Sequence, residues 1–163
     1  MSNNLSTAYF AGGCFWGLEY FLQNLPGVIK TRVGFMGGRT ASPSYEEVSA
    51  HATGHAETLE VIYDESQVSY KELAKIFFEI HDPTQLNRQG PDIGDQYRSE
   101  IFYTSDRQAA IATKLMAELR NKGWAVVTLL NKSGVFWSAD PPHQKYYAKN
   151  GGTPYCHARV ERF

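Results

Sequence analysis

Ala11-Gly12-Gly13-Cys14-Phe15-Trp16-Gly17 is the stretch of sequence from which the rest of the chain can be interpreted. Residues 7–11 before it read as a strand, and from Phe15 onward the apolar residues recur at helical spacing. Gly12 and Gly13 allow the backbone to turn tightly between the two. The pattern therefore predicts that Cys14 lies at the N-terminus of a helix, directly after a strand.

A cysteine in this position is expected to be reactive. Free cysteine is only about 3% ionised at neutral pH, and the positive end of a helix dipole lowers the pKa of a thiol. Trp16 lies off the apolar stripe of its own helix, so it is available to wall a pocket beside the sulfur. The alternative is that Cys14 is a small buried residue and Trp16 packs on a neighbouring element. By periodicity alone, Phe15 is a core residue.

The whole chain limits the possible functions. Its 163 residues suffice for one domain, which we expect to span residues 1–163. The 16 basic and 17 acidic residues are interspersed, so we expect no nucleic-acid partner. The first residues lack the pattern of a signal peptide, and no run has the length of a membrane span, so we expect a cytoplasmic protein without a membrane partner. Two cysteines in a reducing compartment indicate redox or catalytic chemistry.

A carboxylate lies on the apolar, core-facing side of the clearest predicted strand, residues 57–64. Glu57 shares one face with Leu59, Val61 and Tyr63. Desolvation on that face would raise the pKa of Glu57 toward neutrality, as a general acid requires. The alternative is that the first residue of the strand turns into solvent.

Two loops supply further polar groups. Ser44 can cap one helical turn that begins with Tyr45, and the long segment 81–96 delivers Asp92 and then Tyr97 at the entry to a predicted strand, residues 98–103. A loop of this length inside a compact domain is usually functional. Taken alone, each of these side chains is equally typical of an ordinary surface loop.

The remaining pattern predicts helices and one more buried strand. Ser69 begins a capping box for a helix that ends before Pro83, and a second helix runs from about residue 105 to Gly123. Residues 125–130 are almost continuously apolar, which predicts an internal strand. Residues 136–137 read as a short extended piece, and residues 143–150 as a polar helix.

The tail, residues 151–163, is expected to be mobile and carries Cys156. A second thiol on a flexible tail can resolve an oxidised first thiol. An inert thiol is the alternative. The pair His51 and His55 is interrupted by Gly54 and has no third ligand nearby, so no zinc site is predicted.

Four blocks of sequence, in order along essentially the whole chain, resemble the peptide methionine sulfoxide reductases of the A type. They are Gly13-Cys14-Phe15-Trp16-Gly17, Gly54-His55-Ala56-Glu57, Asp82-Pro83-Thr84-Gln85-Leu86-Asn87-Arg88-Gln89-Gly90 and Gln96-Tyr97-Arg98-Ser99. The resemblance implies an α+β fold, a two-layer αβ plait with a split β-α-β, ferredoxin-like core, long loops and a mobile tail.

The resemblance also implies roles for the candidate residues. Cys14 would be the nucleophile, Glu57 the acid that protonates the sulfoxide oxygen, and Cys156 the resolving cysteine. Tyr45 and Tyr97 would bind that oxygen, and Asp92 would order water or neighbouring groups. The substrate itself would contact Phe15, Trp16, Gly13 and His55.

By resemblance, the enzyme would reduce methionine-S-sulfoxide, free or in oxidised proteins. A Cys14 sulfenic acid would form, followed by a Cys14–Cys156 disulfide that thioredoxin reduces, with no metal or cofactor and as a monomer. Two alternatives stay open. One is a cysteine hydrolase or acyltransferase with His55 as the nearest base, and the other is a binding module with an aromatic pocket.

Overall fold

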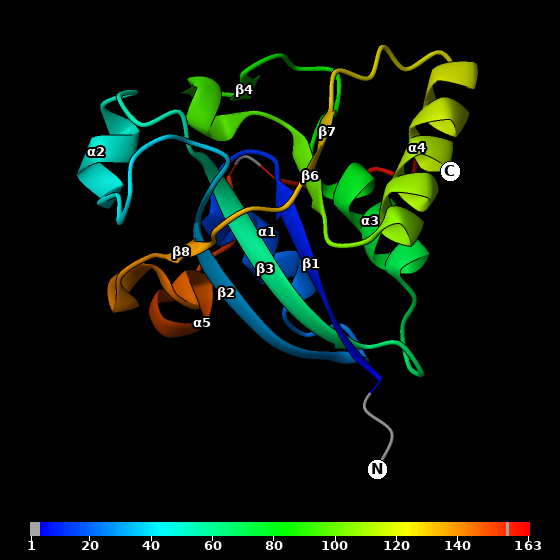
Figure 1. The fold of residues 1–163 in the computed structure, drawn as a ribbon, viewed down its shortest axis with the longest axis horizontal. Coiled ribbons are helices and arrows are strands. Elements are labelled where there is room, and N and C mark those ends of the chain that lie inside the picture. The colour runs from blue at the N-terminus through cyan, green and yellow to red at the C-terminus, as the bar shows by residue number, and fades with distance from the viewer. Residues whose placement is uncertain (1–3, 156) are drawn as a thin grey trace.

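A six-stranded sheet forms the centre of the computed structural model, which describes residues 4–155 and 157–163 (Figure 1). The strand order is β7-β6-β1-β3-β2-β8. β3 pairs antiparallel with both β1 and β2, whereas β7 runs parallel to β6. The strands are β1 (Leu5–Ala11), β2 (Val28–Met36), β3 (Ala56–Asp64), β6 (Glu100–Tyr103), β7 (Leu129–Lys132) and β8 (Trp137–Ser138), with a separate ribbon of β4 (Arg88–Gln89) and β5 (Asp92–Ile93).

Helices complete an α+β fold, as the sequence predicts. They are α1 (Phe15–Leu22), α2 (Tyr45–Ser49), α3 (Tyr70–Ile80), α4 (Asp106–Asn121) and α5 (Tyr146–Asn150), with 3-10 turns η1 (Asp95–Tyr97) and η2 (Pro141–His143). α1 lies behind the sheet in Figure 1, and α3 and α4 lie to one side. Phe10 of β1 packs its ring 4.9 Å from that of Phe77 in α3, so the core lies between sheet and helices.

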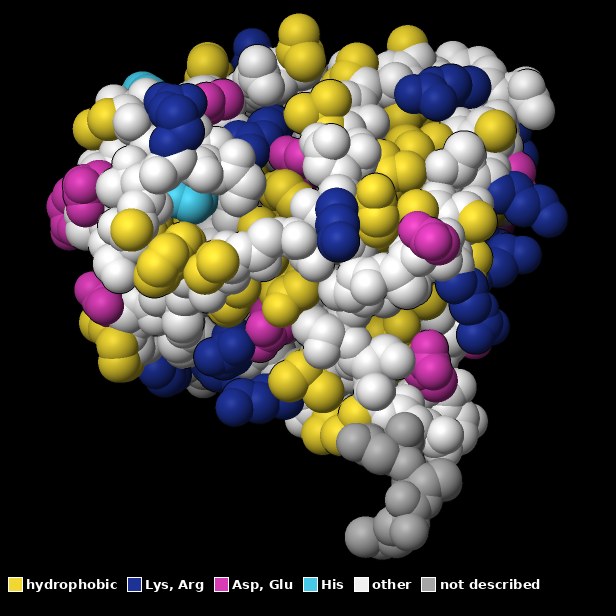
Figure 2. Space-filling view, in the orientation of Figure 1, with side chains coloured by type: hydrophobic (Ala, Val, Ile, Leu, Met, Phe, Trp, Pro, Cys, Tyr) yellow, Lys and Arg dark blue, Asp and Glu magenta, His cyan; other side chains and the backbone are white. Residues whose placement is uncertain are grey.

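The face of the molecule in Figure 2 carries a mixture of side-chain types. Basic and acidic side chains lie near one another there, with apolar side chains between them. No helix within the described part of the chain combines the length and apolar character that crossing a bilayer requires.

The predicted internal strand over residues 125–130 is wrong. The strand begins four residues later, at Leu129, and lies at the edge of the sheet, where it pairs only with β6. The backbone before it is bonded elsewhere: Val127 donates to the Pro83 carbonyl at 2.8 Å, and the Val126 carbonyl accepts from Arg120. The apolar run thus reflects burial of Val126 against the helices without strand pairing.

The prediction of a mobile tail over 151–163 also needs correction, because its last residues are anchored to α3. The Val160 amide donates to the Glu79 carbonyl at 2.7 Å, and Arg159 pairs with the Glu79 carboxylate at 3.1 Å. Arg162 donates to the Phe78 carbonyl at 2.7 Å, and its guanidinium lies over the Trp124 ring. Sequence position alone suggested mobility, whereas these bonds to a distant helix hold residues 159–162.

Candidate active site

Cys14 lies at the first turn of α1, where the sequence places it. It is the N-cap residue, in an extended conformation, and only 6% of its surface is exposed. Gly13 before it has φ +82°, a left-handed conformation that favours glycine. The Gly13 amide donates to the Tyr97 carbonyl at 3.1 Å, so the turn that carries Cys14 is tied to the loop that carries Tyr97.

Glu57 lies in β3 and is fully buried, on the same interior face as Leu59 and Val61. Its Oε1 accepts the Phe15 amide at 3.2 Å, which places the carboxyl at the start of α1. Its Oε2 has no hydrogen-bond partner among the described residues. Burial chiefly, with a smaller effect of the Asp92 charge, raises the pKa of Glu57 to about 8, although the hydrogen bond from the Phe15 amide opposes the shift. The carboxyl therefore holds a proton at neutral pH.

Two phenols flank this carboxyl. Tyr45 is the first residue of α2, the helical turn capped by Ser44 that the sequence predicts, and Tyr97 ends η1. Burial raises the pKa of Tyr45 to about 12, with electrostatic repulsion from Glu57 and Cys14 as further causes. Burial also raises the pKa of Tyr97, and Glu57 again adds to the shift. Both phenols therefore stay protonated and can donate hydrogen bonds in the same small region as Cys14 and Glu57.

Asp92 connects the site to the tail. Its two carboxylate oxygens accept from the Tyr155 hydroxyl at 2.9 and 3.1 Å. The buried ring of His157 lies 2.7 Å from the Gly12 carbonyl, beside the turn that carries Cys14. Cys156 itself lies outside the described residues. Its neighbours in the sequence, Tyr155 and His157, contact Asp92 of β5 and the turn before α1.

An aromatic wall borders the site. The fully buried Phe15 ring lies 5.8 Å from His143, and His143 stacks on Tyr45 at 4.3 Å. Trp16 stacks on Tyr146 at 3.7 Å with the rings 5° from parallel, and its indole nitrogen donates to Nδ1 of His143 at 3.3 Å. Sequence reasoning did not identify His143 and Tyr146. The only signal in the sequence is that a histidine and tyrosines occur in an otherwise polar segment, residues 143–150.

This geometry can be compared with known proteins. The family model for peptide methionine sulfoxide reductase matches residues 6–163. The chain belongs to the peptide methionine sulfoxide reductase family. The family prediction made from the four sequence blocks is therefore confirmed. A curated peptide methionine sulfoxide reductase MsrA from Nautilia profundicola is 50% identical over 149 residues, covering 91% of this chain and 86% of the relative.

Solved structures agree with the family and with the predicted α+β fold. Reduced Mxr1 from Saccharomyces cerevisiae matches with a TM-score of 0.88 at 32% identity, covering 98% of this chain and 93% of that one. Mxr1 in complex with Trx2 matches with a TM-score of 0.64 at 25% identity, covering 97% and 91%. Methionine sulfoxide reductase A of Corynebacterium diphtheriae matches with a TM-score of 0.82 at 37% identity, covering 94% of this chain and 80% of that one.

His55, one of the predicted site residues, binds backbone groups. Nδ1 of His55 accepts the Gly38 amide at 2.9 Å, and its Nε2 lies 2.7 Å from the Thr40 carbonyl. Both ring nitrogens are therefore engaged in holding the loop after β2. Among the described residues, no group of three or more His, Cys, Asp or Glu side chains is arranged to hold a metal ion.

Proposed function

We propose that this protein reduces methionine-S-sulfoxide to methionine, free or in oxidised proteins, with Cys14 as the nucleophile and Glu57 as the acid. The observation that carries the proposal is the buried, protonated Glu57 carboxyl, which is bonded to the first amide of the helix that Cys14 caps. An acid of pKa about 8 next to a cysteine suits a reaction that consumes a proton at neutral pH.

In the first step the Cys14 thiolate attacks the sulfoxide sulfur. Glu57 delivers a proton to the sulfoxide oxygen, and the Tyr45 and Tyr97 hydroxyls donate hydrogen bonds to it. The oxygen ends on Cys14 as a sulfenic acid, so the cysteine sulfur is oxidised by two electrons and the methionine sulfur is reduced by two. Phe15 and Trp16 would hold the methyl group of the substrate, beside Gly13.

In the second step the thiol of Cys156 condenses with the sulfenic acid, releasing water and forming a Cys14–Cys156 disulfide. An external dithiol reduces this disulfide by exchange. Thioredoxin is the proposed reductant, and the solved complex of the relative Mxr1 with Trx2 supports it. The contacts of Tyr155 and His157 beside the site also support the role of Cys156. A monomer acting in the cytoplasm remains the expectation from sequence.

One experiment tests both cysteines. The protein receives one equivalent of methionine-S-sulfoxide without reductant and is then weighed by mass spectrometry. We expect a loss of two hydrogens, with Cys14 and Cys156 linked in the peptide map. A cysteine hydrolase or acyltransferase would instead form a thioester and consume no reductant. It would also need a histidine base, and both ring nitrogens of His55 are already engaged.

The acid is tested separately with Glu57→Gln. Removal of a general acid typically costs about 10²- to 10⁴-fold in rate. We expect a loss of this size in the single-turnover release of methionine, while Cys14 still reacts with iodoacetamide. Near-normal methionine release by Glu57→Gln would remove Glu57 from the mechanism.

A further inference from the structure

Four consecutive residues, His143 to Tyr146, make two kinds of contact. The outer two, His143 and Tyr146, form the aromatic wall against Tyr45 and Trp16. The inner two, Gln144 and Lys145, bind the backbone and side chains of β2 and α1. The segment therefore contacts the candidate site on one side and the scaffold on the other.

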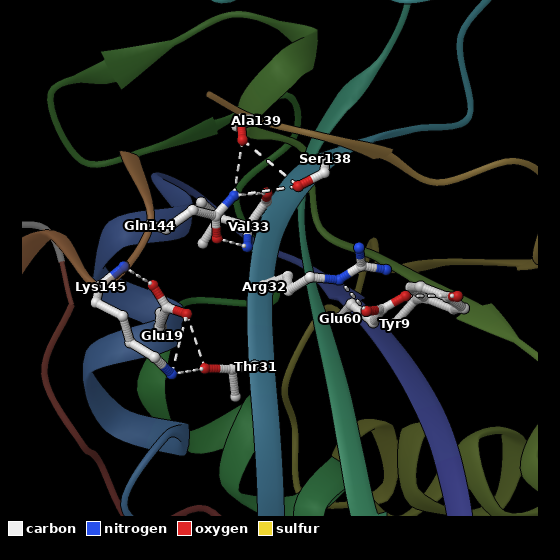
Figure 3. A network of polar contacts seen from close by, with 10 residues as sticks. All are labelled: Tyr9, Glu19, Thr31, Arg32, Val33, Glu60, Ser138, Ala139, Gln144 and Lys145. Atoms are coloured by element: carbon white, nitrogen blue, oxygen red, sulfur yellow. Dashed lines mark hydrogen bonds and ion pairs between the residues drawn. The ribbon is translucent and has the colours of Figure 1, made fainter. Parts of the chain in front are cut away.

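Glu19 of α1 is the centre of the scaffold contact, and 1% of its surface is exposed. Its Oε1 accepts the Lys145 amide at 2.6 Å. Its Oε2 accepts the Thr31 hydroxyl at 2.7 Å and lies 3.7 Å from the Lys145 ammonium, which also donates to Thr31 at 2.7 Å (Figure 3). Glu19, Thr31 and Lys145 thus form a closed set of bonds, which we call the latch.

Gln144 attaches the same segment to β2 through its side chain. Its Oε1 accepts the Val33 amide at 2.8 Å, and its Nε2 donates to the Val33 carbonyl at 2.8 Å and to the Ala139 carbonyl at 2.9 Å (Figure 3). The side-chain amide of Gln144 therefore bonds to the backbone of β2 at Val33. The next two residues of β2, Gly34 and Phe35, pair with β8.

Without these contacts the segment has little to hold its shape. η2 has three residues and α5 has five, both far below the length at which a helix is stable alone. Lys145 between them has φ 56°, a left-handed conformation that is unfavourable for a residue with a side chain. The Lys145 amide is one of the three groups that contact the Glu19 carboxylate.

We propose that Glu19, with Thr31 and Lys145, positions His143 and Tyr146 and so shapes the pocket for the methyl group of the substrate. The inference rests on the proposed function, because that function assigns Trp16 to the substrate. These latch residues are positioning residues and act only through the aromatic wall. Their loss weakens substrate binding and leaves the reaction at the Cys14 sulfur intact.

The chain offers a matched control on the opposite face of the sheet, at Glu60 of β3. Glu60 is 5% exposed, and it accepts from Arg32 of β2 at 2.6 Å and from the Tyr9 hydroxyl at 3.0 Å. Figure 3 shows this set on the other side of β2 from the latch. Glu60→Gln therefore removes one buried carboxylate that is bonded to a basic residue and a hydroxyl, as Glu19→Gln does, but away from the aromatic wall.

The test compares wild type, Glu19→Gln and Glu60→Gln by steady-state kinetics with methionine-S-sulfoxide. For Glu19→Gln we expect KM to rise about tenfold with kcat within about twofold, the signature of lost uniform binding. For Glu60→Gln we expect an unchanged KM. In the tryptophan region of the near-ultraviolet circular dichroism spectrum, which senses the stacking of Trp16 on Tyr146, we expect a change in Glu19→Gln alone. The rate of Cys14 alkylation by iodoacetamide should match wild type in both.

Thr31→Val provides a second variant that conserves shape and β-branching. It tests the role of the latch if Glu19→Gln does not fold. We expect its KM to rise about threefold, since it removes the two bonds of the Thr31 hydroxyl and leaves the contacts between Glu19 and Lys145 in place. A wild-type KM and an unchanged aromatic spectrum in the folded latch variants would overturn the proposal. If the wild type itself reduces no sulfoxide, the proposed function fails. The spectra of Glu19→Gln, Thr31→Val and Glu60→Gln then still decide whether the latch holds the wall.

Discussion

Glu57 carries the chemistry of the site at the scale of a single residue because its surroundings favour the neutral form. Burial raises the pKa of this carboxyl from 4.5 to about 8, and one of its oxygens bonds a backbone amide while the other has no partner among the described residues. Parity along the strand was enough to predict that Glu57 faces the core, since Leu59 and Val61 lie on that face as well.

This raised pKa has a consequence for stability. The folded protein binds the Glu57 proton more tightly than the unfolded chain does, so this proton adds to the free energy of unfolding. The added stability is fully present below about pH 4.5. It is lost progressively as the pH rises toward about 8. The free energy of unfolding of wild type, minus that of Glu57→Gln, should therefore fall between pH 5 and pH 8. Urea unfolding at pH 5, 6.5 and 8 measures this difference, and a pH-independent value would contradict the shifted pKa.

At the scale of elements, α2 presents Tyr45 to the site, and a capping box holds this five-residue helix. The Ser44 hydroxyl accepts the Glu47 amide at 3.1 Å, and the Glu47 carboxylate accepts the Ser44 amide at 2.9 Å. So short a helix depends heavily on its cap, and loss of a serine cap costs about 1 kcal/mol. We expect Ser44→Ala to lower kcat/KM for sulfoxide reduction several-fold.

Ser69→Ala is the matched control, because Ser69 and Glu72 form the same capping box on α3. α3 has eleven residues and a buried face against Phe10, so its cap is a smaller share of its stability. We expect this variant to unfold at a lower temperature with unchanged kcat/KM. Equal losses of activity in the two variants would mean that the cap of α2 has no particular influence on Tyr45.

Elements with a local signal could be predicted from sequence, and those defined by distant contacts could not. Both capping boxes, the turn at Gly13 and the burial of Glu57 depend on residues within a few positions of one another. The start of β7 could not be predicted, because residues 126–127 bond to the Arg120 guanidinium and the Pro83 carbonyl, which lie outside the sheet. The contact of Trp16 with His143 spans 127 residues, and no periodicity in either segment reports it.

At the scale of the whole molecule, the tail links the helical side of the fold to the candidate site. Residues 159–162 bind α3 through Glu79, whereas Tyr155 contacts Asp92 and His157 contacts the turn before Cys14. These contacts hold Tyr155 and His157, the neighbours of Cys156 in the sequence, beside the candidate site. Anchoring of this kind raises the effective concentration of one group near another.

Loosening the anchor on α3 should therefore slow the second step of the cycle and spare the first. Glu79 binds the Arg159 guanidinium at 3.1 Å and the Arg162 amide at 3.2 Å, and Glu79→Gln weakens both bonds. Rapid quenching after sulfoxide addition would measure methionine release and disulfide formation separately. We expect methionine release at the wild-type rate and disulfide formation slowed several-fold. Glu161→Gln, which makes the same charge change at an exposed position of the tail, should leave both rates unchanged. If Glu79→Gln forms the disulfide as fast as Glu161→Gln, the contacts at α3 do not guide residue 156 toward Cys14.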